Sequence, residues 1–156
     1  MKPDITTKQM GDACEMLVVA ELTLAGVPAV KMPDNWPDYD VIALPKNGGT
    51  RLNISVKSRT FKHGRDAYVE YNIKDKSFDW MAIVILPNDN GEPDKRRIFI
   101  FPKTISDDRF RHNGKPGTKY HDFMTVQVDK IAELLPEFED NFCLSATGKN
   151  NVATET

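Results

Sequence analysis

An unbroken apolar run, Trp80-Met-Ala-Ile-Val-Ile-Leu86, limits the folds open to this chain more than any other segment. A strand that is apolar at every position belongs inside a sheet whose two faces are both covered. The run is therefore predicted to be a buried central strand. Any fold that leaves one face of the sheet in water is disfavoured.

A long helix is predicted ahead of the sheet. Thr6-Thr-Lys-Gln9 fits a capping box, with Thr6 as the N-cap and Gln9 three residues later. Apolar residues then recur at helical spacing from Met10 to Leu24. Gly26 is a natural helix stop.

Other segments carry strand patterns that Gly, Pro and Asn separate. Residues 27–32, 39–44, 51–58, 97–101 and 123–128 are predicted to be strands, and residues 67–73 either extend the sheet or form a hairpin. Pro45–Gly49 is predicted to be a turn, 106–120 a mobile basic connection, and Asp129 to about Phe138 a helix. This order indicates a mixed α/β sheet with helices packed on it.

Length and cysteine usage indicate one cytoplasmic domain. The 156 residues suit a single domain, predicted over 1–144, with a polar, disordered tail over 145–156. Cys14 and Cys143 form no CxxC pair and follow no signal peptide, so we expect reduced thiols in the cytoplasm. No apolar run approaches the ~18 residues that a membrane span needs, so no membrane partner is expected.

Charge is informative in its distribution rather than in its sum. A net charge of -2 argues against a protein that coats nucleic acid through bulk charge. Basic residues nevertheless cluster after the third predicted strand, where Arg59, Lys62 and Arg65 are candidate phosphate contacts. The plainer interpretation of such a cluster is a solvated loop.

Two neighbouring strands carry residues suited to metal-dependent phosphodiester cleavage. Asp40 opens one strand, and Ser55 and Lys57 are two apart on the next, so they share one face. The turn between the strands would bring Asp40 near Ser55 and Lys57. Mg²⁺ prefers carboxylate oxygens, and a lysine can orient or activate the attacking water. Asp38 is the alternative acid, but the apolar strand begins directly after Asp40.

At these positions the chain resembles the PD-(D/E)xK nuclease superfamily, especially its small resolvase-like and homing-endonuclease-like members. That family shows a Gly and a Glu four apart in the first helix, here Gly11 and Glu15. A strand-opening Asp follows, here Asp40, and then an acid-x-Lys strand, here Ser55-Val-Lys57. The resemblance is close over residues 11 to about 59 and loose to about 105.

The resemblance implies a restriction-endonuclease-like fold, a mixed central sheet flanked by helices. It implies a Mg²⁺- or Mn²⁺-dependent endonuclease acting on DNA, with metal held by Asp40, Glu15 and Ser55 and with Lys57 positioning water. It also implies a homodimer.

Ser55 departs from the family pattern, because a hydroxyl lacks the charge of the usual Asp or Glu. Three explanations stay open. Ser55 is a neutral ligand, another carboxylate such as Glu70 supplies the charge, or the site has decayed. The third gives the alternative function, a nuclease-fold module that binds nucleic acid or a protein without cutting.

Overall fold

The fold consists of two sheets with helices packed against them, in a computed structural model that describes residues 4–45 and 49–149. Within these residues, five strands form a mixed sheet in the order β1-β2-β3-β5-β6, and three form a second sheet in the order β4-β8-β7. The strands are β1 (Ala29–Lys31), β2 (Val41–Ala43), β3 (Leu52–Thr60), β4 (Tyr68–Asn72), β5 (Trp80–Leu86), β6 (Arg97–Pro102), β7 (Arg111–His112) and β8 (Phe123–Gln127). The described α-helices are α1 (Thr7–Leu24), α2 (Lys103–Arg109) and α3 (Ile131–Leu134). The predicted mixed α/β sheet with flanking helices is confirmed.

Helix α1 begins directly after its predicted N-cap. The Thr6 hydroxyl accepts the N–H of Gln9 at 3.0 Å, and the Gln9 side chain accepts the N–H of Thr6 at 2.9 Å. Gly26 takes a φ of 92°, which lets the chain leave the helix. The buried stripe of α1 consists of Cys14, Val18 and Leu22.

Replacing Thr6 with alanine is expected to lower the free energy of unfolding by about 1 kcal/mol, because the Gln9 N–H loses its side-chain acceptor. Urea denaturation measures the change. Thr6→Ser keeps the acceptor and should stay close to the native protein. Equal losses in the two variants would contradict the capping role.

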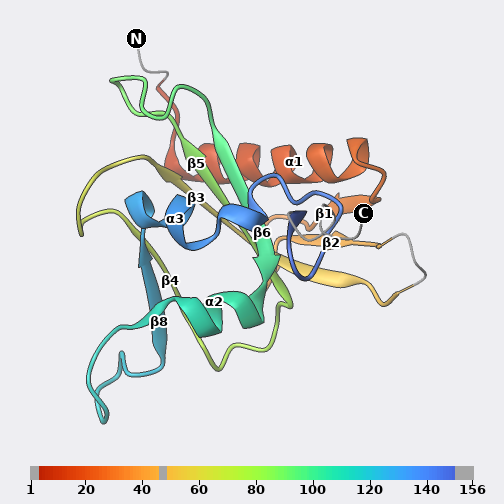
Figure 1. The fold of residues 1–156 in the computed structure, drawn as a ribbon. Helices are drawn as coiled ribbons and strands as arrows, with labels where there is room; N and C mark the ends of the chain where they lie inside the picture. The colour runs from red at the N-terminus through yellow and green to blue at the C-terminus, as the bar shows by residue number, and fades with distance from the viewer. Residues whose placement is uncertain (1–3, 46–48, 150–156) are drawn as a thin grey trace, which may run out of the picture.

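Strand β5 has the predicted bounds and is the spine of the core. Its first six residues are buried, and it pairs parallel to β3 and antiparallel to β6. On one face Ala82 and Val84 pack in the cluster that includes α1. On the other, Met81 and Ile83 pack with residues of β4, β8 and α3. Figure 1 shows α1 on one side of the large sheet and α3 and β8 on the other.

The second sheet was not foreseen. Strand β4 neither extends the large sheet nor forms a hairpin with the strand before it. It pairs antiparallel with β8, from Tyr68 opposite Gln127 to Asn72 opposite Phe123. Because the partners are more than fifty residues apart in sequence, no local turn pattern announces the pairing.

Two predicted segments were wrong in part. The connection predicted over 106–120 contains the end of α2 and the short strand β7. The only fully buried residue of α2 is the polar Ser106, so the sequence shows no apolar repeat that would predict this helix. The helix predicted from Asp129 to Phe138 is instead a 3-10 turn, the short α3 and a second 3-10 turn. Pro136 starts that second turn, since proline has no N–H to continue an α-helix.

Two predictions fall partly on residues outside the description. The Pro45–Gly49 turn includes 46–48, and the tail includes 150–156, none of which is described. At the start of the tail, the Ser145 carbonyl accepts from the Asn141 side chain at 2.9 Å. The domain boundary at 144 therefore stays a prediction. Among the helices in the described part of the chain, none is long and apolar enough to cross a membrane.

Candidate active site

The predicted site lies where β2 and β3 separate. Strand β2 pairs with β3 only over Leu52–Ile54, whereas β3 continues to Thr60 along β5. Beyond the paired stretch, the Asp40 N–H donates to the Ile54 carbonyl at 3.0 Å. The Asp40 carboxylate Oδ2 accepts the N–H of Val56 at 2.8 Å, in place of the backbone of β2. Asp40 is thereby fixed against β3 one residue before Lys57.

Lys57 lies on the face of β3 that points away from α1. Ser55 and Lys57 pair with Met81 and Ile83 of β5, whose side chains pack toward the second sheet. The alternate β3 residue Ile54 packs in the cluster with α1. Residues 55 and 57 therefore share one face, and Asp40 lies near enough for its charge to act on Lys57.

The Lys57 ammonium group is half-buried and makes no hydrogen bond or ion pair with any residue that the structure describes. Burial lowers the pKa of Lys57, and the charge of Arg59 lowers it further. The charges of Asp40, Asp75 and Glu70 act in the opposite direction. A desolvated amine beside a fixed carboxylate is an arrangement more typical of catalysis than of stability.

Glu15 shares a small pocket with Asp40. The pocket has a volume of about 80 Å³, and residues of α1, β1 and the 32–40 segment line it. Burial raises the pKa of Glu15, and the nearby Asp40 charge raises it further. Lys31 partly offsets this effect, with its Nζ 3.6 Å from the Glu15 carboxylate. The two acids of the predicted metal site are thus within electrostatic reach of one another.

Ser55 does not complete a three-acid cluster. The residue is 7% exposed, and none of the described side chains or backbone groups hydrogen-bonds its hydroxyl. Among the described residues, no three His, Cys, Asp or Glu side chains are grouped to hold a metal ion. Mg²⁺ is nevertheless commonly bound by one or two carboxylates, with water and substrate phosphate completing its shell. Asp40, whose Oδ1 accepts no hydrogen bond from the described residues, and Glu15 fit that mode of binding.

Asp75 is a second acid near Lys57 that the sequence did not single out. The Ser77 N–H donates to Asp75 Oδ1 at 2.9 Å, and the Ser77 hydroxyl donates to the Asp38 carbonyl at 3.1 Å. The Asn53 side chain donates to the Ser77 carbonyl at 3.3 Å. This loop is therefore tied to β3 and to the segment that precedes β2. The pattern Asp-Lys-Ser is a turn signal in sequence, and only the tertiary fold places its acid near Lys57.

Glu70, the substitute acid weighed in the sequence, is on β4. Its carboxylate accepts from the Asn113 side chain at 3.1 Å, and its charge acts on both Lys57 and Arg59. Neither Glu70 nor Asp75 lines the pocket that holds Asp40 and Glu15. Asp38 is exposed with a φ of 86°, and its carbonyl accepts the hydrogen bond from the Ser77 hydroxyl.

The three candidate phosphate contacts have different surroundings. Arg59 is half-buried and donates to the backbone carbonyls of Tyr68 and Ser58, both at 2.8 Å, so it joins β3 to β4. Lys62 is exposed and 3.9 Å from Asp66. Arg65 is exposed and lines a larger pocket on the second sheet.

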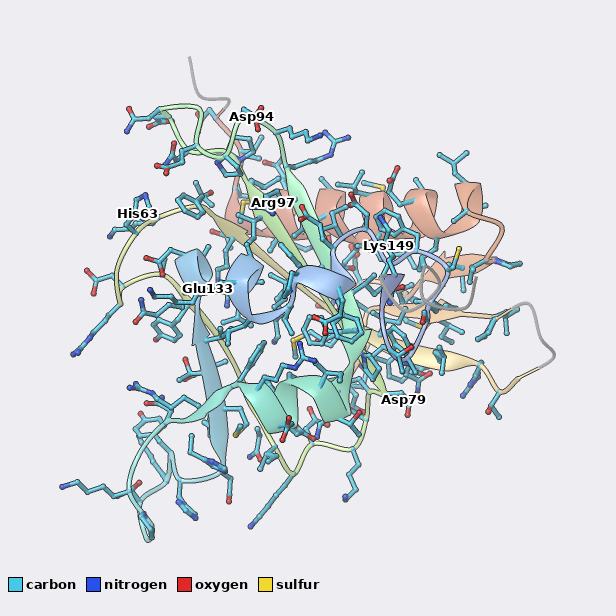
Figure 2. All side chains as sticks on the ribbon, in the orientation of Figure 1. His63, Asp79, Asp94, Arg97, Glu133 and Lys149 are labelled. Atoms are coloured by element: carbon cyan, nitrogen blue, oxygen red, sulfur yellow. The ribbon has the colours of Figure 1, made fainter. Side chains whose placement is uncertain are left out.

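The loop that carries Lys62 and Arg65 begins at the end of β3 that is far from Asp79, the residue before β5. In Figure 2, His63 on this loop and Asp79 lie at opposite ends of the molecule's long strands. His63 is 2.9 Å from Glu92, which accounts for its position without a catalytic role.

Comparisons with known proteins identify two nucleases of similar shape. One is a bacterial homing endonuclease, at 16% identity and a TM-score of 0.47, covering 78% of this chain and 75% of that one. The other is a Holliday junction resolvase from Archaeoglobus fulgidus, at 15% identity and 0.45, covering 78% and 90%. No family model matches. No curated protein matches either. The candidate site therefore stands on its own residues.

Proposed function

We propose that this protein is a Mg²⁺- or Mn²⁺-dependent endonuclease that hydrolyses phosphodiester bonds in DNA at the β2–β3 fork. One observation carries the proposal. Lys57 is a half-buried amine without a described partner, next to a carboxylate that β3 itself holds in place. Partial burial of a lysine without a described partner costs stability, whereas hydrolysis needs a group that can take a proton.

In the proposed reaction, Asp40 and Glu15 would hold the metal, which would lower the pKa of bound water and offset phosphate charge. Lys57 Nζ, as the neutral amine, accepts a proton from the attacking water. The water oxygen bonds to phosphorus as the bond from phosphorus to the leaving sugar oxygen breaks, and that oxygen takes a proton from solvent. Ser55 adds an uncharged oxygen beside Lys57. A cytoplasmic location and a homodimer remain predictions from the sequence.

Incubation with supercoiled plasmid and with short duplex, branched and single-stranded DNA tests the proposal. We expect cleavage with Mg²⁺ or Mn²⁺ and none with chelator. Ser55→Ala should lower the rate if the hydroxyl is a ligand. Failure to cut any of these substrates with either metal would refute the nuclease assignment.

The rate of cleavage is expected to rise with pH, because only the neutral form of Lys57 accepts a proton. Since burial and Arg59 lower the Lys57 pKa, the rise should level off below the ordinary lysine range. Arg59→Gln removes one of these causes, so the Lys57 pKa increases and the rise moves to higher pH. Single-turnover rates between about pH 6 and 10 measure the profile.

Arg96→Gln is the matched control for this profile, because Arg96 is an exposed arginine that is not among the charges acting on Lys57. Its profile should match that of the native protein. A shift to lower pH in Arg59→Gln, or an equal shift in both variants, would contradict the role of Lys57.

The second candidate is a non-catalytic module that binds nucleic acid or a protein partner. It is favoured by Ser55 and by the lack of a three-acid metal group among the residues described. Binding to DNA that persists in chelator, weakens with salt and never leads to turnover would support it.

A further inference from the structure

The outward face of the second sheet carries a pocket that the proposed chemistry does not use. Along β4, Val69 and Tyr71 point into the core, whereas Tyr68, which precedes Val69, faces outward and is 44% exposed. Its partner across the sheet is Gln127, and Arg111 of β7 stands opposite Thr125 on the same face. Together with neighbouring residues of α2, α3 and the 61–67 loop they line a pocket of about 390 Å³. We call this the arginine pocket; its charged lining residues are Arg65, Arg109, Arg111 and Lys130.

The arginine pocket has a surplus of positive charge. Among the residues that the structure describes, no acidic residue lines it. Arg109 is neutralised by two bonds to Glu137, at 2.9 and 3.0 Å. Lys130 is 3.4 Å from Glu133, which Figure 2 labels on α3. Arg65 and Arg111 are exposed and form no ion pair with the residues described, so both guanidinium groups are available to an anion.

The chemistry of this lining suits a nucleotide of an unpaired strand. Guanidinium groups bind phosphate through two parallel hydrogen bonds, and this volume is in the range of small-ligand pockets. An exposed tyrosine ring beside such a basic groove provides a surface on which a base can stack. Stacking on Tyr68 requires a base whose face is free, which excludes the interior of a duplex.

Strand β4 connects the arginine pocket with the candidate active site. The Tyr68 carbonyl accepts from Arg59, two residues beyond Lys57 on β3. Glu70, next on the outward face of β4, is one of the charges that act on Lys57. Strand β4 therefore links the arginine pocket to β3, the strand that carries Lys57.

We propose that the arginine pocket binds a single-stranded segment of nucleic acid, with phosphate at Arg65 and Arg111 and a base on Tyr68. The idea that this segment is the part of the substrate next to the scissile bond rests on the proposed nuclease function. The idea that the pocket binds a single strand does not depend on it. The substrate would then contain an unpaired region, such as a flap, a branch or a free strand.

Fluorescence anisotropy with a labelled single strand, and with the duplex of the same sequence, tests this proposal in chelator, where no cutting occurs. The native protein should bind the single strand more tightly. The double variant Arg65→Gln, Arg111→Gln should lose about ten-fold or more in affinity. Tyr68→Ala should weaken single-strand binding roughly five-fold or more and leave duplex binding nearly unchanged. Equal losses for both forms in Tyr68→Ala would overturn the single-strand assignment.

The matched control is Lys95→Gln, Arg96→Gln, which removes the same charge from exposed residues outside the arginine pocket. If it weakens binding as much as the arginine double variant does, bulk charge explains the effect and the pocket is refuted. Competition with inorganic phosphate tests whether the pocket binds free phosphate rather than the phosphate of a nucleic-acid strand. Full displacement of the strand by millimolar phosphate at constant ionic strength would reassign the pocket to free phosphate.

A Lys57→Met protein separates the two proposals. It should bind the single strand like the native protein, because Lys57 does not line the pocket. If the unmodified protein binds the single strand but never cuts it with Mg²⁺ or Mn²⁺, the nuclease is refuted and the pocket stands. Cleavage that survives the arginine double variant with unchanged affinity refutes the pocket and leaves the nuclease.

Discussion

Lys57→Met is expected to reduce DNA cleavage by about 10²- to 10⁴-fold, the usual contribution of a positioned proton acceptor. The same change should raise the free energy of unfolding at neutral pH. Methionine keeps much of the apolar stem of the side chain and removes an amine whose charged form is disfavoured by burial. Quantitative plasmid cleavage and urea denaturation measure the two effects.

The gain in stability should depend on pH in a defined direction. Because the folded-state pKa of Lys57 is lowered, its charged form reduces the free energy of unfolding of the native protein at every pH below that value. The penalty fades as pH rises through the lowered pKa toward the unfolded value, so the two proteins should converge in alkali. Lys95→Met, at an exposed lysine, should change neither property. A Lys57→Met protein that is less stable and still active would refute this account of Lys57.

Asp40 is expected to show two separable roles. Asp40→Asn keeps an oxygen that can accept the Val56 N–H but loses the charge, so cleavage should fall about 100-fold or more while stability stays close to native. Asp40→Ala removes the acceptor as well. It should lose the same activity and also about 1–3 kcal/mol of stability, because the Val56 N–H is left without a partner.

Cleavage assays and denaturation curves of both Asp40 variants provide the comparison. Glu15→Gln is a useful third variant, because loss of metal-dependent cutting there without loss of fold would support a shared site. If Asp40→Asn cuts as fast as the native protein, the carboxylate has only a structural role. The nuclease proposal would then lose its metal ligand.

Sequence patterns were reliable where one segment carries the whole signal. The capping box fixed the start of α1, and the apolar run fixed both ends of β5. They failed where the information is shared between distant segments. The pairing of β4 with β8 depends on two separated strands, and α2 buries too little to show a helical repeat.

The candidate site follows the same division. Asp40 lies just before β2 and Lys57 lies on the neighbouring β3, so the strand pattern and the turn between the strands predicted that the acid lies near the lysine. Asp75 is in a loop, where no periodicity marks which side chains face the site. The arginine pocket combines residues as far apart in sequence as Arg65 and Leu134, and its Tyr68 has only an ordinary strand pattern in sequence.

Asp40 has a structural role through its bond to the Val56 N–H, whereas Lys57 has no such role in the described part of the chain. The two residues would therefore respond differently to a loss of catalysis. A lineage that had given up catalysis would keep the aspartate, since its backbone still needs that acceptor. It would be free to discard the lysine, and selection for a sturdier fold would favour doing so. Under the nuclease proposal the amine at position 57 has a use that offsets its cost in stability, whereas under the binding proposal it has none.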